Sequence, residues 1–192
     1  VLGTRPEIIK MSRLLVNFDE SFNHKIIHTG QNYDYELNKI FFDEFQLRKP
    51  DYFLNSKNKS NIQVISKIFL NIEKILLKEK PDAFVVYGDT NSCLSVYVAK
   101  RLKIPIFHFE AGNRCFDENV PEEINRRIID HISDVNFVLS DHARSYLINE
   151  GIKQNFIIKT GSHLKEVIEF NKEKIEKLKI LSKFKLSKKN YF

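Results

Sequence analysis

The sequence predicts an α/β protein built on a doubly wound parallel sheet. Short apolar runs alternate with longer segments of helical period through most of the 192 residues, and small or charged residues directly follow several of the runs. Hydrophobic residues make up 42% of the chain, which is enough for a sizeable core. With only six Gly and five Pro, the composition excludes collagen-like and Pro/Gly-rich disordered proteins, and no apolar run approaches the roughly 20 residues of a membrane helix.

Five apolar runs are predicted as strands, and Val1 and Leu2 as the last piece of a first strand. The runs cover residues 25–28, 83–87, 104–109, 136–139 and 156–158. The helices are predicted over residues 7–17, 35–45, 62–80, 92–102, 122–132, 141–149 and 165–181. Pro6 and Pro121 suit the first turn of a helix, because the amides of that turn donate no hydrogen bond within the helix and proline, which lacks the amide proton, costs nothing there. The helix over 62–80 carries apolar residues at spacings of three or four and is interpreted as a core-facing crossover.

The formal charge of +6 is concentrated near the C-terminal end. Residues 165–192 hold nine Lys and four Glu, whereas residues 1–164 hold 22 basic and 21 acidic residues. We therefore predict a nearly neutral domain over residues 1–164, followed by a basic helix and linker over residues 165–192. The four Glu of this segment would be repelled by anionic lipid, so a membrane is not the expected partner. Basic and aromatic residues alternate in KFKLSKKNYF at residues 183–192, but one short run is weak support for nucleic-acid binding, so a nucleic acid is not expected either.

The two cysteines, Cys93 and Cys115, are predicted to be free thiols in a cytoplasmic protein, because they can form one bridge at most and neither lies in a CxxC spacing. The six histidines show no metal-binding spacing, so no metal site is predicted. The chain starts at Val1 and turns apolar just as it stops, which is typical of a piece cut from a longer protein.

Three predicted strand ends carry the residues best suited to chemistry. Ligands of doubly wound sheets bind at the carboxyl ends of strands, and the residues there are Gly3-Thr4-Arg5, Gly88-Asp89-Thr90 and Glu110-Ala111-Gly112. At the first, Arg5 and Lys10 flank a helix N-terminus, a combination that can bind an anion of the phosphate type. A solvated Arg before a helix is the simpler alternative.

Three carboxylates are candidates for proton transfer: Asp89, Glu110 and Glu122. Acids brought together at strand ends repel one another's ionised form, which can provide a general acid beside a general base. The alternative is that they cap turns and helices. His108 lies two residues before Glu110 and is expected on the same strand face, as a wall residue rather than a catalyst.

Three strings resemble those of the non-hydrolysing UDP-N-acetylglucosamine 2-epimerase family: GTRPEIIK at residues 3–10, YGDTNS at 87–92 and HFEAGNRCFDENVPEEINRRIIDH at 108–131. The similarity runs from Val1 to about Gly161. It implies the Rossmann-like N-terminal half of a GT-B-like fold and a UDP-sugar substrate. It also implies that carbon 2 is inverted without a cofactor, by elimination and re-addition of UDP, in the synthesis of surface polysaccharides such as capsule or O-antigen.

The resemblance implies roles for five residues. Arg5 and Lys10 are similar to cations that meet the substrate, and Asp89, Glu110 and Glu122 to acids assigned to proton transfer and substrate placement. The family's second domain, with a catalytic histidine and most of the UDP site, has no counterpart here. The isolated chain is therefore expected to be inactive or nearly so, and the full-length protein to be a homodimer.

Two further features bear on the substrate and on the alternatives. GQNYDYEL at residues 30–37 replaces a string typical of epimerases activated by their own substrate. It looks more like the branch that acts on UDP-2-acetamido-2,6-dideoxy-L-talose, on the route to UDP-N-acetyl-L-fucosamine. The alternatives are a non-catalytic remnant domain and a GT-B glycosyltransferase, although GTRPE and HFEAGNR disfavour the latter.

Overall fold

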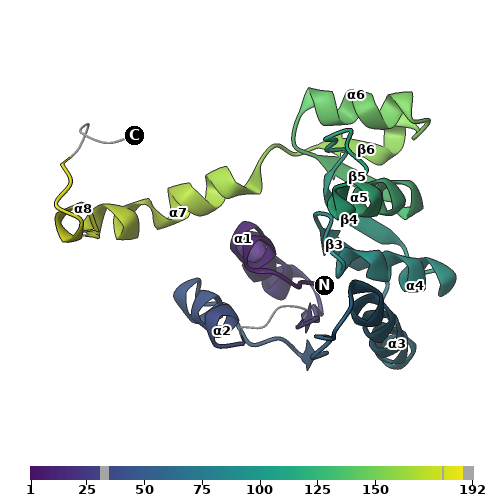
Figure 1. Cartoon of the computed structure of the whole chain (residues 1–192), viewed down its shortest axis with the longest axis horizontal. Helices are drawn as coiled ribbons and strands as arrows, with labels where there is room; N and C mark the ends of the chain where they lie inside the picture. The colour runs from purple at the N-terminus through teal and green to yellow at the C-terminus, as the bar shows by residue number, and fades with distance from the viewer. Residues whose placement is uncertain (31–34, 179, 188–192) are drawn as a thin grey trace.

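The computed structural model describes residues 1–30, 35–178 and 180–187 (Figure 1). The strands are β1 (Ile27–His28), β2 (Tyr52–Phe53), β3 (Phe84–Tyr87), β4 (Ile106–Ala111), β5 (Val135–Val138) and β6 (Ile157–Lys159). The helices are α1 (Arg5–Ser21), α2 (Tyr35–Glu44), α3 (Asn61–Glu79), α4 (Val96–Arg101), α5 (Pro121–Ile132), α6 (Asp141–Asn149), α7 (His163–Lys177) and α8 (Ile180–Lys183). Single 3-10 turns lie at Cys93–Ser95 and Gln154–Phe156.

All of the strand pairs are parallel, in the order β3-β4-β5-β6 and, separately, β1-β2. The backbone at Val1 and Leu2 joins the two groups. Leu2 forms a parallel bridge with His28 of β1, and the backbone nitrogen of Val1 donates to the carbonyl of Val85 in β3 at 2.8 Å. The predicted first strand thus lies between β1 and β3, where the strand order reverses and ligands of such sheets bind.

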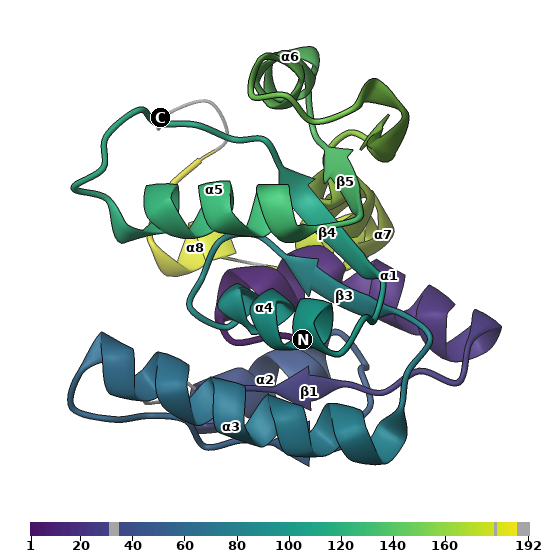
Figure 2. The same cartoon turned by 90° about the vertical axis from the view of Figure 1, so that its right-hand side faces the viewer.

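The helices cover both faces of the sheet, which confirms the doubly wound prediction. In Figure 2, α3, α4 and α5 lie in front of the sheet, and α1 and α7 lie behind it. One core, including Ile68, Val86 and Ile129, fills the space under α3, α4 and α5. A second, including Ile8, Tyr87 and Phe109, fills the space under α1 and α2. Within the described ranges, no helix combines the length and apolar character needed to cross a bilayer.

The predicted elements are confirmed with small shifts at their ends, apart from two helices that divide, and one strand of the structure was not predicted. The strand β2 is missing from the prediction, because two residues show no alternation that periodicity could detect. The helix predicted over 92–102 divides into a 3-10 turn and α4.

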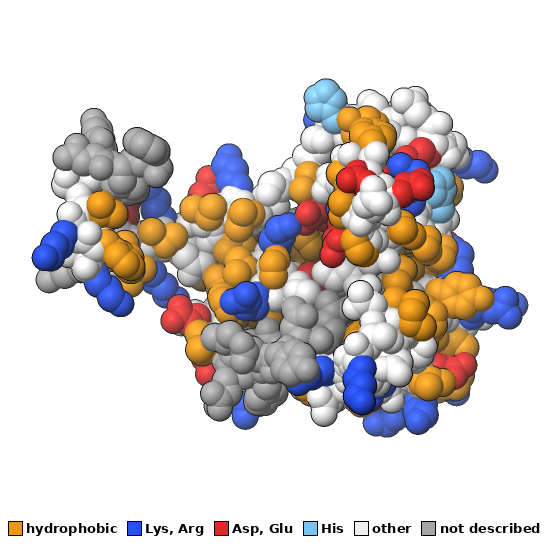
Figure 3. Space-filling view, viewed as in Figure 1, with side chains coloured by type: hydrophobic (Ala, Val, Ile, Leu, Met, Phe, Trp, Pro, Cys, Tyr) orange, Lys and Arg blue, Asp and Glu red, His pale blue; other side chains and the backbone are white. Residues whose placement is uncertain are grey.

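The helix predicted over 165–181 divides into α7 and α8. The backbone of Leu178 is extended (φ −72°, ψ 124°), and Ile168, Ile175 and Leu178 are at least half exposed. Figure 3 shows such uncovered hydrophobic side chains along α7 and α8. Because so little apolar surface is buried here, tertiary packing does not stabilise one continuous helix over this range. The boundary predicted at residue 164, between the domain and its terminal helix, stays a prediction. The helix α7 begins at His163, just before that boundary, and packs along α1 with Val167 buried.

The loop before α5 is held by the buried carboxylate of Glu123. One of its oxygens accepts hydrogen bonds from the amide of Cys115 at 3.0 Å and from the Cys115 thiol at 3.3 Å. Arg126 and Arg127 also contact this carboxylate. Burial by itself raises the pKa of Glu123, but the hydrogen bonds from Cys115 and Arg127 and the charge of Arg126 outweigh it and lower the pKa to about 2.

We expect Glu123→Gln to reduce the free energy of unfolding at neutral pH and to remove part of its pH dependence. The folded-state pKa of Glu123 lies below the ordinary value of about 4.3. Its stabilising effect is therefore present above that value and is lost as the pH falls towards 2. Urea unfolding across this range should show the difference between wild type and variant shrinking as pH falls. Glu20→Gln, an exposed acid on α1, serves as the control, and a difference that stays constant with pH would contradict the interpretation.

Candidate functional site

The candidate site lies at the point where the strand order reverses, between the residues after Leu2 and those after β3. Glu7, in the first turn of α1, links the two. Its carboxylate accepts hydrogen bonds from the amides of Gly3 and Thr4 and, at 2.7 Å, from the hydroxyl of Thr90. Burial raises the pKa of Glu7, and these hydrogen bonds offset the rise only in part. The start of α1 and the Gly88-Asp89-Thr90 strand end are thereby held together.

The backbone at Gly3 approaches its neighbours too closely for any side chain. A Cβ atom there would lie 1.8 Å from the hydroxyl oxygen of Ser92 and 2.7 Å from that of Thr29. These two hydroxyls are hydrogen-bonded to each other at 2.7 Å. A glycine at position 3 therefore lets the first strand end lie against the segment that follows Asp89.

Glu110 sits in a bulge of β4. Phe109 pairs with Phe137 and Ala111 with Val138, so Glu110 has no partner on β5, and its φ of +66° is one that side chains rarely adopt. The bulge turns the carboxylate towards α1, where the Lys10 ammonium lies 2.6 Å away. The expectation that His108 and Glu110 share a face is wrong, because the extra residue in the bulge interrupts the alternation of side chains.

Aromatic groups surround the Lys10–Glu110 pair. The Lys10 nitrogen lies 5.4 Å from the centre of the Tyr87 ring. Burial, the charge of Glu110 and a hydrogen bond with Glu110 raise the pKa of Tyr87, so its hydroxyl remains a donor. The ring of His163, at the start of α7, packs edge-on against Tyr87 and Phe109. Glu110 is thus held by a cation and a hydroxyl in a largely apolar setting.

Asp89 is held from the opposite side of the sheet. Two guanidinium nitrogens of Arg126 on α5 donate to one of its oxygens, at 2.9 and 2.6 Å, and Asn125 donates to its backbone carbonyl at 2.9 Å. Burial raises the pKa of Asp89, Arg126 lowers it in part, and the charges of Glu110 and Glu122 raise it further. The carboxyl of Asp89 therefore holds its proton more tightly than an ordinary aspartate does.

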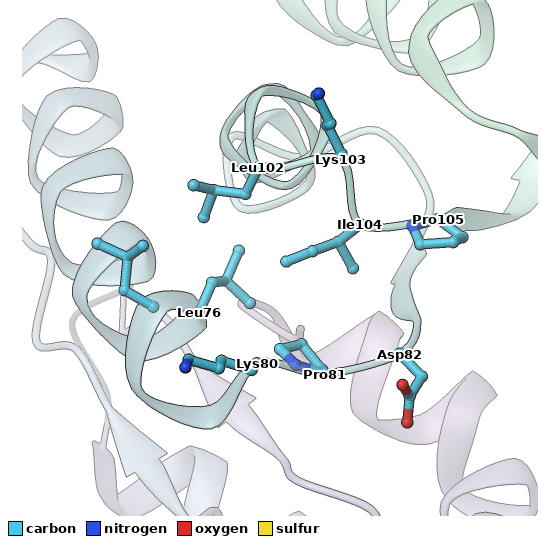
Figure 4. A pocket seen from close by; sticks show the side chains of 9 residues that line it. Leu76, Lys80, Pro81, Asp82, Leu102, Lys103, Ile104 and Pro105 are labelled. Carbon is cyan, nitrogen blue, oxygen red and sulfur yellow. The ribbon is translucent and has the colours of Figure 1, made fainter.

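A cavity of about 270 Å³ opens beside these acids. It is lined by Thr4, Asn61, Val64, Thr90, Asn91, Pro121 and Glu122. Figure 3 shows acidic side chains gathered between α1 and the sheet. A larger cavity, of about 420 Å³, lies at the opposite, amino ends of β3 and β4, between the ends of α3 and α4. Leu76, Leu102 and Ile104 point towards one another in it (Figure 4), Lys80, Asp82 and Lys103 also line it, and it lies away from the acids.

The structure brings four of the five predicted site residues together. Asp89 interacts electrostatically with Glu110 and with Glu122, and Lys10 binds Glu110. Arg5 is exposed, and its side chain makes no hydrogen bond or ion pair with any described residue. The proton-transfer and substrate-binding roles of all five residues stay predictions. The segment GQNYDYEL lies largely outside what the structure describes, since residues 31–34 are not described.

Sequence reasoning missed the residues that hold the acids in place, notably Arg126, Glu7 and Tyr87. Arg126 stands four residues after Glu122, so both lie on one face of α5, and this spacing could have revealed it. Glu7 stands three residues after Thr4, as in a capping box. Nothing in the sequence marks Tyr87 as a site residue, because it is the last residue of an apolar run that predicts a strand.

The arrangement is suited to acid–base chemistry on a polar, anionic ligand. It places one carboxyl of raised pKa near a second carboxylate that is paired with a lysine, beside a cavity next to the start of α1. Among the described residues, no group of three His, Cys, Asp or Glu side chains could hold a metal ion.

Solved structures closely match this fold. The UDP-N-acetylglucosamine 2-epimerase from Rickettsia bellii superposes with a TM-score of 0.91 at 55% identity, over 97% of this chain and 50% of that one. The Methanocaldococcus jannaschii UDP-GlcNAc 2-epimerase, solved in complex with UDP-GlcNAc and UDP, superposes with a TM-score of 0.89 at 43% identity, over 95% of this chain and 51% of that one.

Curated relatives agree with the structural matches. A UDP-2,3-diacetamido-2,3-dideoxy-D-glucuronate 2-epimerase from Pseudomonas aeruginosa is 39% identical over 80% of this chain and 44% of its own length. This chain spans about half the length of the curated relatives it matches. The sequence model of the family described as UDP-N-acetylglucosamine 2-epimerase matches residues 16–192. Sequence and structure together therefore show that the chain belongs to the UDP-N-acetylglucosamine 2-epimerase family.

Proposed function

We propose that this chain forms the acid-bearing half of a 2-epimerase that inverts carbon 2 of a UDP-N-acetylhexosamine. The observation that carries the proposal is the pair of carboxyls at neighbouring strand ends, Asp89 bound to Arg126 and Glu110 bound to Lys10. Family membership and the substrates named for the relatives support a UDP-sugar as the ligand.

The reaction has two halves that run in opposite directions. In the first, a base removes the proton from carbon 2, the bond from carbon 1 to the UDP oxygen breaks, and the products are a 2-acetamidoglycal and UDP. In the second, carbon 2 receives a proton on its other face and UDP adds back to carbon 1. Such a reaction needs carboxyl groups to exchange the proton and cations to stabilise the leaving diphosphate.

The surroundings of the two acids favour different roles. Glu110 is paired with the Lys10 ammonium at 2.6 Å, and we assign it the role of the base. The raised pKa of Asp89 favours a protonated carboxyl, which suits an acid. Glu122 lines the cavity and is placed to orient the sugar. Arg5, exposed in the first turn of α1, is free to meet the diphosphate, and Lys10 can reach the substrate only by leaving Glu110.

Two substrates are consistent with the sequence. UDP-GlcNAc is named for most of the relatives, whereas GQNYDYEL favours UDP-2-acetamido-2,6-dideoxy-L-talose. A cytoplasmic location, where nucleotide sugars are made and thiols stay reduced, suits the free Cys93 and Cys115. The products would serve surface-polysaccharide synthesis.

The activity can be tested with a chimera of this chain and the second half of the Rickettsia bellii protein, because the chain alone spans about half the family's length. In deuterated water we expect each substrate that is turned over to gain deuterium at carbon 2, followed by NMR. The isolated chain should show little or no exchange. An active chimera that converts the sugars without deuterium entry, or one that binds UDP yet epimerises neither substrate, would overturn the proposal.

Asp89→Asn and Glu110→Gln should each lower kcat of the chimera by about 10²-fold or more, since proton transfer by a positioned group contributes about 10²–10⁴-fold. The fold should survive Asp89→Asn, because Arg126 keeps Glu123 as a partner at 3.0 Å. Circular dichroism checks folding, and Glu118→Gln, a 77% exposed acid on the neighbouring loop, is the matched control. Wild-type rates in both variants would refute the assignment.

We also propose that the full-length protein is a homodimer that pairs through the outer face of α3, α4 and α5. These three helices pack side by side on one face of the sheet (Figure 2). They leave large apolar side chains exposed: Leu70 at 61%, Leu77 at 56%, Tyr97 at 49% and Ile128 at 42%. An uncovered apolar face of this kind is typical of an interface between subunits.

Replacing Leu70 and Tyr97 together by Lys should convert the dimer into a monomer, because two charges would be buried at the interface without partners. Sedimentation equilibrium measures the mass. Ile148→Lys, at an exposed apolar position on α6, is the control and should leave the mass unchanged. A dimer that persists in the double variant would place the interface elsewhere.

A further inference from the structure

The cavity of about 270 Å³ beside the acids is lined almost entirely by uncharged groups. Its one charged side chain is the carboxylate of Glu122, and the other lining groups are hydroxyls, carboxamides, Val64 and Pro121. A carboxylate repels a phosphate, whereas hydroxyl and amide groups form hydrogen bonds with an uncharged polar group. The cavity is therefore suited to a part of the ligand other than its diphosphate.

The place of the cavity limits which part of a UDP-sugar can enter it. Thr90, directly after Asp89, lines it, and so does Glu122. Asp89 and Glu122 are two of the three candidate acids at the reacting carbon, so a group in the cavity is one bonded at or next to carbon 2. The uridine is separated from carbon 2 by carbon 1 and the diphosphate, whereas the acetamido group is bonded to carbon 2 directly.

The lining offers one hydrogen-bond donor and one acceptor that match an acetamido group. The side-chain oxygen of Asn91 accepts from Asn125 at 3.3 Å, and the Asn91 NH₂ group makes no hydrogen bond with any other described residue. The hydroxyl of Thr90 donates to Glu7 at 2.7 Å, so its oxygen can still accept. An acetamido group presents the reverse pair, because its carbonyl oxygen accepts and its N–H donates.

An apolar surface in the same cavity can meet the methyl group. Val64, near the start of α3, is buried in the core under that helix, and Pro121 at the start of α5 adds a second apolar side chain. One water molecule needs only about 10–15 Å³ of such volume. A cavity of about 270 Å³ therefore admits a group of several heavy atoms.

We propose that this cavity holds the 2-acetamido group of the sugar, with Asn91 donating to its carbonyl oxygen, Thr90 accepting from its N–H and Val64 contacting its methyl group. The identity of the ligand rests on the proposed function, and both proposed substrates carry an acetamido group on carbon 2. Holding this group orients carbon 2 towards the carboxyls that exchange its proton. Asn91, Thr90 and Val64 thereby determine specificity for the acetamido group.

Asn91→Ala removes the donor, and its effect is read as a difference between two ligands. Calorimetry measures the Kd of the chimera for UDP-GlcNAc and for UDP-glucose, which has a hydroxyl in place of the acetamido group. The Glu110→Gln background keeps turnover slow during the titrations. We expect the Kd ratio of UDP-glucose to UDP-GlcNAc to fall about fivefold in Asn91→Ala, because only the acetamido carbonyl loses its donor. Asn149→Ala, at an exposed position of α6, is the matched control.

Val64→Ala tests the apolar end of the cavity. The smaller side chain makes room for an N-propionyl analogue of UDP-GlcNAc, which is one methylene longer. We expect the Kd ratio of this analogue to UDP-GlcNAc to fall about tenfold in the variant. Val98→Ala, at a buried valine of α4 in the same core, is the control for a general loss of packing and should leave the ratio unchanged. Circular dichroism checks the folding of each variant.

Equal weakening of both ligands in Asn91→Ala, or an unchanged Kd ratio, would overturn the proposal and place another part of the sugar in the cavity. A chimera that binds UDP-glucose as tightly as UDP-GlcNAc before any change at Asn91, or a Val64→Ala variant that gains nothing for the N-propionyl analogue, would likewise contradict it. Loss of the acetamido preference in Asn91→Ala, in a chimera that epimerises neither substrate, would refute the proposed function and support the acetamido pocket.

Discussion

The partial burial of two carboxyls at neighbouring strand ends is the constraint on which the rest of this structure depends. Parallel strands bring their carboxyl ends to one edge, and β3 and β4 place Asp89 and Glu110 there. Like charges in a partly buried setting disfavour one another, so each acid needs its own counter-charge. Arg126 supplies one from α5 and Lys10 the other from α1. Because these helices lie on opposite faces of the sheet, the site needs both layers of the doubly wound fold.

The bulge in β4 decides which layer Glu110 meets. Regular alternation would direct its side chain to the face of His108 and Asp130, where a further carboxylate would add to the repulsion. One unpaired residue reverses the direction and brings Glu110 to Lys10 and Tyr87. The next turn depends on Gly112, where a Cβ atom would lie 2.5 Å from the carbonyl oxygen of Ala143. The position of one carboxylate is thus fixed by backbone geometry on both sides of it.

The elements that periodicity detects are those that bury a regular apolar face. The helix α3 was predicted within one residue at each end, because Ile68, Ile72 and Leu76 recur at helical spacing against the core. Where burial is slight, periodicity failed. The strand β2 is two residues long, and the helix over 165–181 divides at Leu178, where the apolar stripe faces solvent. Asp89 and Glu110 were predicted because charged residues after apolar runs mark strand ends, and Glu122 because it stands at the start of the following helix.

The amino-acid sequence by itself determined the fold class, the order of the elements and the three carboxyls brought to one region, because these follow from local hydrophobic patterns and from the rule that parallel strands end together. The partners of those carboxyls were decided only by the tertiary structure. Lys10 and Glu110 lie 100 residues apart in the chain, and Arg126 lies 37 residues from Asp89. No local pattern encodes such distances, because they arise only when the helices pack on opposite faces of the sheet and a single bulge turns one side chain across it.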